Sequence, residues 1–153
     1  MRLDRFDYEY ILWCAPRRAR PSLRVVFALD ARLGGIMPAA REPLLGQIKL
    51  AWWREQLLAL TGATTPAEPL LGALSTLISA KLTGAQLADL IEEETHGDAM
   101  LSVLEAICGA QSRAALLFVK FARDEETRLH AGRPLASPAA HAIMALQMRL
   151  LGG

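Results

Sequence analysis

The sequence predicts an all-α fold, and its composition, its hydrophobic periodicity and its helix-boundary residues support that prediction. Ala and Leu make up roughly a third of the 153 residues, whereas Val, Ile and Thr make up about an eighth, a mixture that favours helices over strands. Apolar residues recur three and four positions apart, and no segment alternates with the two-residue period of a strand. We expect one domain spanning residues 1–153, built as a single-layered bundle of six or seven helices.

The first two helices are expected over residues 4–14 and 21–34, with Pro16 ending the first. The second helix repeats apolar residues at helical spacing, except that Asp30 is a polar residue on its apolar stripe. The Gly-Gly-x-x-Pro sequence at 34–38 ends or distorts this helix.

Residues 41–60 form the third expected helix, with Pro43 suited to its first turn. The adjacent residues Trp52 and Trp53 point about 100° apart on a helix, so only one of them is expected to face the core. The other is expected at a cleft, a partner surface or a lipid interface. The face expected to pack inward consists of Leu45, Ile48, Trp52, Glu55 or Gln56, and Ala59.

Capping-box sequences at 65–68 and 83–86 open two further helices. A long helix follows, bent near Gly109, and Ser-Pro at 137–138 opens the last helix. The expected ranges of these helices are 66–82, 83–94, 98–130 and 138–150.

Composition excludes several classes of protein. Hydrophobic residues make up 52% and charged residues 22%, which excludes intrinsic disorder, and a net charge of +1 argues against a nucleic-acid partner. Cys14 and Cys108 are too few and too far apart for a disulfide scaffold or a paired-cysteine zinc site. Because no signal peptide or membrane span is recognisable, we expect a cytoplasmic protein. A mean hydropathy of +0.22 indicates a large core, a partner, or a peripheral contact with a membrane.

A group of arginines, Arg17, Arg18, Arg20 and Arg24, precedes and enters the second helix. Guanidinium groups near a helix N-terminus hold phosphate or diphosphate in many proteins. The alternative is that they are the solvated charges of a connector. If the chain binds an anion, we expect Arg20 and Arg24 to contact it.

Two acidic segments of the sequence contain side chains that are candidate metal ligands. Asp124 and Glu125 lie in a carboxylate cluster that could bind Mg²⁺ together with a substrate phosphate, or could form an exposed face paired with Arg128. The Glu-x-x-His step that ends at His96 resembles one half of a di-iron site, but it has no second copy in the sequence. We therefore expect no metal site from composition and spacing alone.

The segment from residue 16 to residue 54 resembles the N-terminal part of the squalene/phytoene synthase family, and particularly the branch that includes the mitochondrial complex I assembly factors and their bacterial relatives. This resemblance covers roughly a quarter to a third of the chain. It rests on Pro16 with Arg20, on Phe27-Ala28-Leu29, and on Glu42-Pro43-x-x-Gly46-x-Ile48-x-Leu50-x-Trp52-Trp53-Arg54.

The resemblance implies a truncated isoprenoid-synthase fold. Active members join two prenyl diphosphates head to head in isoprenoid biosynthesis, with Mg²⁺ held by two aspartate-rich motifs. Here Gly34, Gly35 and Pro38 stand where the first motif has its aspartates. Arg123-Asp124 is a weak match to the second motif, and Arg128 stands in place of its other carboxylate.

These departures predict a non-catalytic, transferase-like pseudoenzyme. We expect it to bind a prenyl diphosphate or similar isoprenoid ligand, or a protein partner as an assembly factor, through Arg20, Arg24, Trp53 and Arg54. One alternative is an active Mg²⁺-dependent prenyltransferase that uses Asp124 and Glu125, with Asp30. Another is a structural helical module that forms a homo-oligomer. No cofactor is expected other than Mg²⁺ in the active alternative.

Overall fold

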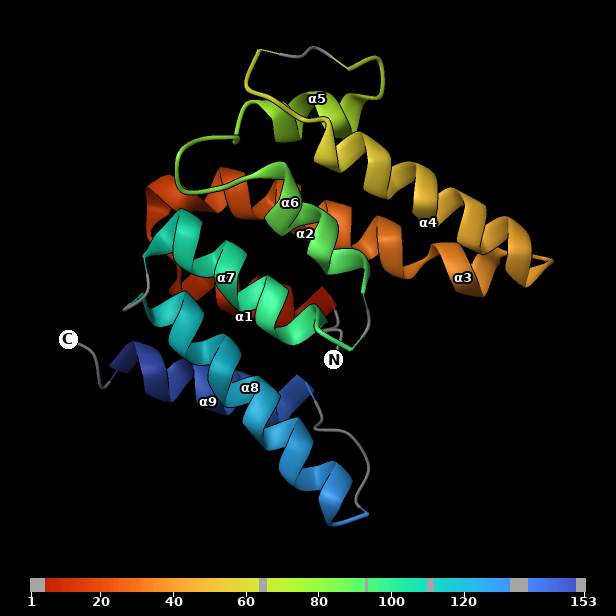
Figure 1. Cartoon of the computed structure of the whole chain (residues 1–153). Helices are drawn as coiled ribbons and strands as arrows, with labels where there is room; N and C mark the ends of the chain where they lie inside the picture. The colour runs from red at the N-terminus through yellow and green to blue at the C-terminus, as the bar shows by residue number, and fades with distance from the viewer. Residues whose placement is uncertain (1–4, 64–65, 93, 110–111, 133–137, 151–153) are drawn as a thin grey trace.

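The computed structural model describes the chain except for residues 1–4, 64–65, 93, 110–111, 133–137 and 151–153. All regular secondary structure in the described residues is helical, which confirms the predicted fold class (Figure 1). The helices are α1 (Arg5–Cys14), α2 (Arg20–Gly34), α3 (Ile36–Ala39), α4 (Pro43–Leu58), α5 (Pro69–Ser75), α6 (Gly84–Ala88), α7 (His96–Cys108), α8 (Arg113–His130) and α9 (Pro138–Leu150), with short 3-10 turns η1 (Arg17–Ala19) and η2 (Asp89–Ile91).

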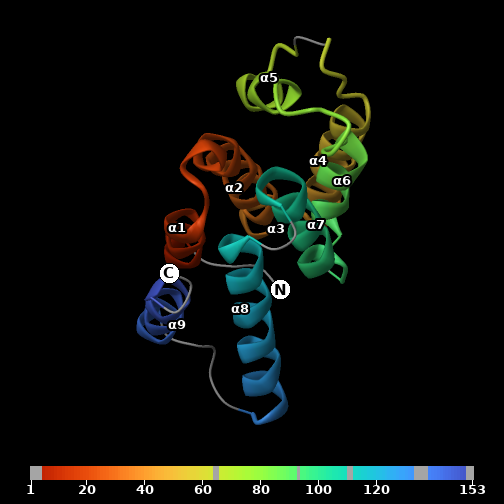
Figure 2. The ribbon, with the colours of Figure 1, turned by 90° about the vertical axis from the view of Figure 1, so that its left-hand side faces the viewer.

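The bundle has more than one layer. Helix α8 packs against α1, α7 and α9, and α1 packs against α2, α8 and α9. A helix in a single layer has at most two lateral neighbours, so the expected single-layered arrangement is wrong. Figure 2 shows α9, α1 and α8 as one group, with α2 and α7 on the other side of α1 and α8.

The described residues contain nine α-helices rather than six or seven, because one expected helix is divided and a short helix forms in a segment where none was expected. The segment expected as one helix over 98–130 breaks at Gly109, whose φ of 96° lies in the region that favours glycine. Helix α2 ends at Gly34, and a separate short turn of helix, α3, follows Gly35.

Of the two predicted capping boxes, the one at 83–86 forms, whereas α5 begins later than the one at 65–68 predicts. At α6 the Thr83 side chain accepts from Gln86 N and the Gln86 side chain accepts from Thr83 N, so the predicted capping box is present. Helix α5 instead begins at Pro69, with the Glu68 side chain accepting from Leu71 N at 2.8 Å. It ends at Ser75 rather than near residue 82, and Thr65 lies outside the described residues.

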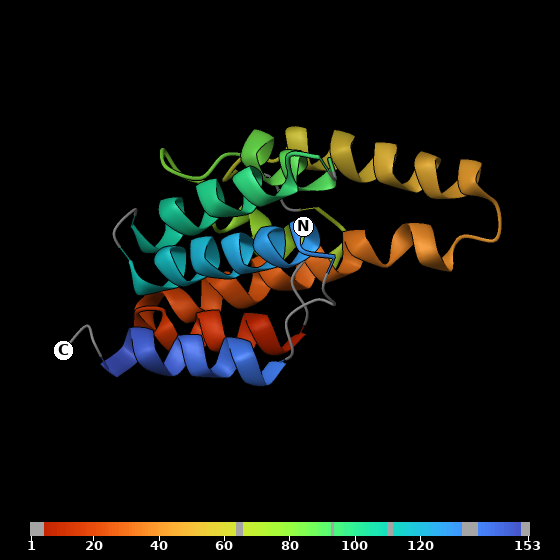
Figure 3. The same cartoon turned by 90° about the horizontal axis from the view of Figure 1, so that it is seen from below.

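The inward face of α4 is the opposite of the predicted one. Gly46, Trp53 and Leu57 are its buried residues, whereas Ile48 and Trp52 are exposed. Figure 3 shows that α3 and α4 run side by side and extend beyond the ends of the other helices. Much of the outer side of α4 is therefore left without a neighbour.

Helix α4 is fixed to α6 by a close backbone approach. A Cβ atom placed on Gly84 would lie 2.1 Å from the backbone oxygen of Leu57. Only a glycine permits this approach without displacement of one helix.

The buried apolar side chains form one contiguous core. Among its largest fully buried members are Phe118 and Phe121 of α8, Ile11 of α1 and Leu23 of α2. In the described part of the chain, no helix combines the length and the apolar character needed to cross a bilayer.

Candidate functional site

Asp30 is completely buried between three helices. It lies about one turn from the C-terminal end of α2, and its Oδ1 atom is 2.6 Å from Nε2 of His96, the first residue of α7. The hydroxyl of Tyr8 on α1 donates to its Oδ2 atom. The Tyr8 ring stacks on Phe27 with ring centroids 4.4 Å apart, which holds the hydroxyl in place. The polar residue predicted on the apolar stripe is thus matched by partners from two other helices.

A second buried pair joins α1 to α9. Asp7 Oδ1 is hydrogen-bonded to His141 Nδ1, and both side chains are buried. The ring of His141 stacks on Phe121 with centroids 4.1 Å apart. On its other side, His141 Nε2 lies 3.9 Å from Oδ2 of Asp124 on α8.

The two pairs form one structure because Asp7 and Tyr8 are neighbours on α1. We call the six residues the polar chain: Asp124, His141, Asp7, Tyr8, Asp30 and His96. It connects α8, α9, α1, α2 and α7. Four of its members are at most 5% exposed, so a substrate in solution does not reach them. Hydrogen bonds of the polar chain join α1, α2, α7 and α9, and the 3.9 Å approach of His141 to Asp124 places α8 beside them. Buried polar groups are kept by such hydrogen bonds, so the polar chain fixes how these four helices meet.

Two of the predicted metal ligands, Asp30 and Asp124, belong to the polar chain. Both carboxylate oxygens of Asp30 have partners in the polar chain. Asp124 Oδ2 accepts from Arg128 Nε at 3.0 Å, which is the pairing expected for an exposed helix face. The Glu125 side chain lies outside the described part of the structure. Within the part that is described, no group of three His, Cys, Asp or Glu residues could hold a metal ion.

Arg20 and Arg24 have different surroundings. Arg20 donates from Nε to Ala15 O at 3.2 Å and from Nη2 to Trp13 O at 3.0 Å, so it caps the C-terminal end of α1. Arg24 is exposed, and its Nη1 atom lies 3.8 Å from Oε1 of Glu9. Both arginines line a small cavity of about 150 Å³, which Glu9 also lines. Arg20 also lines a larger cavity of about 650 Å³.

Trp53 and Arg54 point to different places. Trp53 is 5% exposed and lines a cavity of about 460 Å³ between α2, α3 and α4, together with Arg32 and Lys49. Arg54 is exposed and forms an ion pair with Glu92, which follows η2. The four residues predicted to bind a ligand are therefore not gathered at one site.

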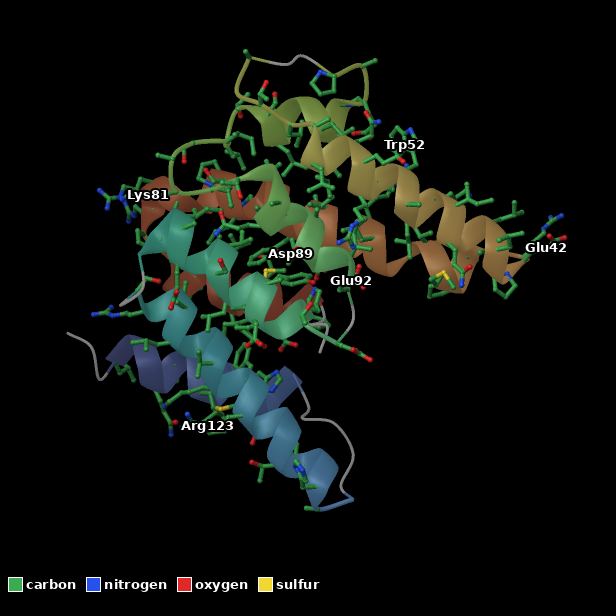
Figure 4. All side chains as sticks on the ribbon, viewed as in Figure 1. Glu42, Trp52, Lys81, Asp89, Glu92 and Arg123 are labelled. Atoms are coloured by element: carbon green, nitrogen blue, oxygen red, sulfur yellow. The ribbon has the colours of Figure 1, made fainter. Side chains whose placement is uncertain are left out.

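A row of large apolar side chains lies on the outer face of α4. We call Leu44, Leu45, Ile48 and Trp52 the α4 stripe, and they are between 44% and 64% exposed. The Trp52 ring meets the Trp53 ring edge to face, with centroids 5.3 Å apart. Figure 4 shows Trp52 on the side of α4 that faces away from α3. Only one of the two tryptophans faces the core, as predicted, but it is Trp53 rather than Trp52, which the predicted inward face contained.

Three members of the polar chain, Asp7, Tyr8 and His141, were not singled out in the sequence, and His96 was singled out only as the end of a Glu-x-x-His step rather than as a partner of Asp30. His141 was detectable in principle, because it is the one polar residue in the first two turns of an apolar helix. A polar side chain on an apolar stripe, such as Asp30, implies a buried partner elsewhere.

Comparisons of this chain with protein-family models, with curated proteins and with solved structures found no match.

Proposed function

We propose that this chain is a non-catalytic, cytoplasmic protein of the squalene/phytoene synthase type, and that it binds a helix of a partner protein along the α4 stripe. The observation that carries this proposal is the exposure of four large apolar side chains on one face of α4, while the opposite face packs into the bundle.

The size of the stripe supports binding. Its four side chains expose roughly 400 Å² of apolar surface, which is in the range of the largest apolar patches on monomers, and such patches are often functional. Covering that area would contribute about 10 kcal/mol before the entropic cost of association is subtracted. Because Leu44, Ile48 and Trp52 are spaced four residues apart, they form a row that suits the apolar side of another helix.

The charges around the stripe favour a protein rather than a membrane surface. Glu55 lies one turn beyond Trp52 on the same face, and Lys49 and Arg54 lie at the edges of the stripe. Arg54 is paired with Glu92. Helices that lie on membranes have polar faces rich in Lys and Arg. The residues around the α4 stripe instead include both acidic and basic side chains. We expect the partner helix to place a basic side chain opposite Glu55.

The surroundings of the carboxylates support a non-catalytic role. Asp30 is buried and bonded to Tyr8 and His96, so its oxygens already have partners within the protein. The positions that correspond to the first aspartate-rich motif are Gly34, Gly35 and Pro38, which have no ligating side chain.

Photocrosslinking tests the proposal. A photoreactive phenylalanine analogue at position 48 should yield one discrete product with a different protein in the native cells. The same analogue at position 18 should yield no such product, because this position is exposed and lies in η1, outside α4. A synthetic peptide spanning the crosslinked helix should bind the purified chain at least tenfold more weakly after Trp52→Ala. Leu146→Ala, which changes an exposed leucine of α9, should leave the peptide's affinity unchanged.

Three results would overturn the proposal. A product with the mass of two copies would identify the stripe as a homodimer interface. Binding to phospholipid vesicles that is lost in the Trp52→Ala protein, without a protein crosslink, would identify a membrane contact. An absence of any product specific to position 48 would leave the stripe without a partner.

A further inference from the structure

We infer that the cavity between the α1–α2 junction and the α7–α8 junction binds a small organic phosphate. This cavity has a volume of about 650 Å³, and its lining includes Arg17, Arg20 and Arg113. It is separate from the α4 stripe, so this inference does not depend on the proposed function.

The charge of the lining favours an anion. Three guanidinium groups line the cavity, and none of the lining residues in the described part of the chain carries a carboxylate. Among the described residues, neither Arg17 nor Arg113 forms an ion pair. Arginines without a partner carboxylate at a concave surface are suited to bidentate contact with phosphate oxygens.

The partial charges of the helix ends around the cavity change its net positive charge little. The N-terminal ends of α2 and α8, which begin at Arg20 and Arg113, contribute about half a positive charge each. The C-terminal ends of α1 and α7 contribute about half a negative charge each. These partial charges sum to about zero, against three full positive charges. The net field at the cavity is therefore positive.

Arg20 is held in a fixed position at this cavity. Its Nε and Nη2 atoms donate to the carbonyl oxygens of Ala15 and Trp13 at the end of α1. These two bonds use two of the five N–H groups of the guanidinium. The remaining three are available to a ligand, and the guanidinium loses little additional entropy when it binds one.

Several features of the cavity favour a phosphate ester rather than a simple inorganic ion or a carboxylate. Trp13 and Pro16 provide an apolar wall on which the organic part of the ligand can rest. A phosphate ester has about 1.5 to 2 negative charges at neutral pH, which matches a site with three arginines better than the single charge of a carboxylate. Ser112, which lies just before α8, adds a hydroxyl to the lining.

Isothermal titration calorimetry with phenyl phosphate tests the inference. We expect saturable binding that is at least tenfold weaker in each of the Arg17→Ala and Arg113→Ala proteins. Arg18→Ala is the matched control, because Arg18 is an exposed arginine next to Arg17 that does not line the cavity. Arg20→Ala is avoided because it would also remove the cap of α1.

No saturable binding, or equal binding by all variants, would overturn the inference. An equal loss of affinity in the Arg18→Ala protein would also overturn it, since that result would show attraction to overall positive charge. Vesicles that contain phosphatidic acid, compared with vesicles of phosphatidylcholine alone, distinguish the source of the phosphate. Binding to phenyl phosphate but not to these vesicles supports a soluble ester. Arg17-dependent binding to the phosphatidic acid vesicles supports a lipid headgroup at the same site.

Discussion

Nε2 of His96 lies 2.6 Å from Oδ1 of Asp30, and neither side chain is accessible to solvent. The two residues are 66 positions apart in the sequence and join the last turns of α2 to the start of α7. Because each would be a buried polar group without a partner if the other were removed, the pair stabilises the bundle chiefly through the cost of breaking it.

Replacing Asp30 should therefore destabilise the protein. We expect Asp30→Asn to lower the free energy of unfolding by about 3 kcal/mol, because it removes the carboxylate that contacts both His96 and Tyr8. Chemical denaturation monitored by circular dichroism would measure this change. Asp89→Asn is the matched control at an exposed position, and we expect a change within about 0.5 kcal/mol. Equal stability of the two variants would contradict the interpretation of the polar chain.

Adding a methyl group at Gly84 should separate α4 from α6. Gly84→Ala would place a Cβ atom 2.1 Å from the backbone oxygen of Leu57, so one helix has to move. We expect a loss of about 2 to 3 kcal/mol in denaturant titrations. Gly97→Ala has no atom within 4 Å of the added Cβ and lies in α7, so its stability should be unchanged or raised by up to about 1 kcal/mol.

The two tryptophans of α4 should respond differently to truncation. Trp53 is 5% exposed, and Trp53→Ala should cost about 3 to 5 kcal/mol because it leaves a large cavity. Trp52→Ala should cost at most about 1 kcal/mol, which is the value of its edge-to-face contact with Trp53. Thermal and denaturant unfolding of both variants would measure the difference. A larger loss at Trp52 would mean that the orientation of α4 is wrong.

Cys108 should react slowly with alkylating reagents. Burial raises the pKa of its thiol from the ordinary value of 9.0 to about 11. At pH 8 this lowers the fraction of the thiol present as thiolate about a hundredfold. A thiolate of higher pKa is more nucleophilic, which raises the reaction rate of each thiolate about tenfold. We therefore expect alkylation by iodoacetamide to be at least about tenfold slower than that of an unstructured cysteine peptide.

The pH dependence of this reaction is a further check on the same thiol. The rate should rise about tenfold per pH unit and level off near pH 11, because only the thiolate reacts. Peptide mass spectrometry would separate the product at Cys108 from that at Cys14. A rate that levels off near pH 9 would contradict the raised pKa.

The helical class could be predicted from the sequence because it depends on local properties. The Thr83 capping box is an example, since its two hydrogen bonds lie within four consecutive residues. The inward face of α4 could not be predicted in the same way. Leu45, Ile48 and Trp52 form one apolar row and Leu50, Trp53 and Leu57 form another, so periodicity does not distinguish the buried face from the exposed one.

The polar chain could be predicted only in part. Asp30 was noticeable as a polar residue on an apolar stripe, but its partner lies 66 residues away. Asp7 and His141 are 134 residues apart. Such pairs form only when helices from distant parts of the sequence pack together, and no local pattern specifies which histidine meets which aspartate. The roles predicted for Arg24, Trp53 and Arg54 remain predictions.

The position of the polar chain in the sequence determines which part of the protein could unfold locally without breaking it. Its members come from residues 7–30 and 96–141, so the segment from α3 to η2 contributes none of them. This segment could detach as a unit without breaking any hydrogen bond of the polar chain. Cooperative units of this kind open at a lower free energy than the whole protein. Opening of this segment would uncover core side chains such as Trp53, Leu57 and Leu87, but it would leave intact the polar chain that joins the two ends of the sequence.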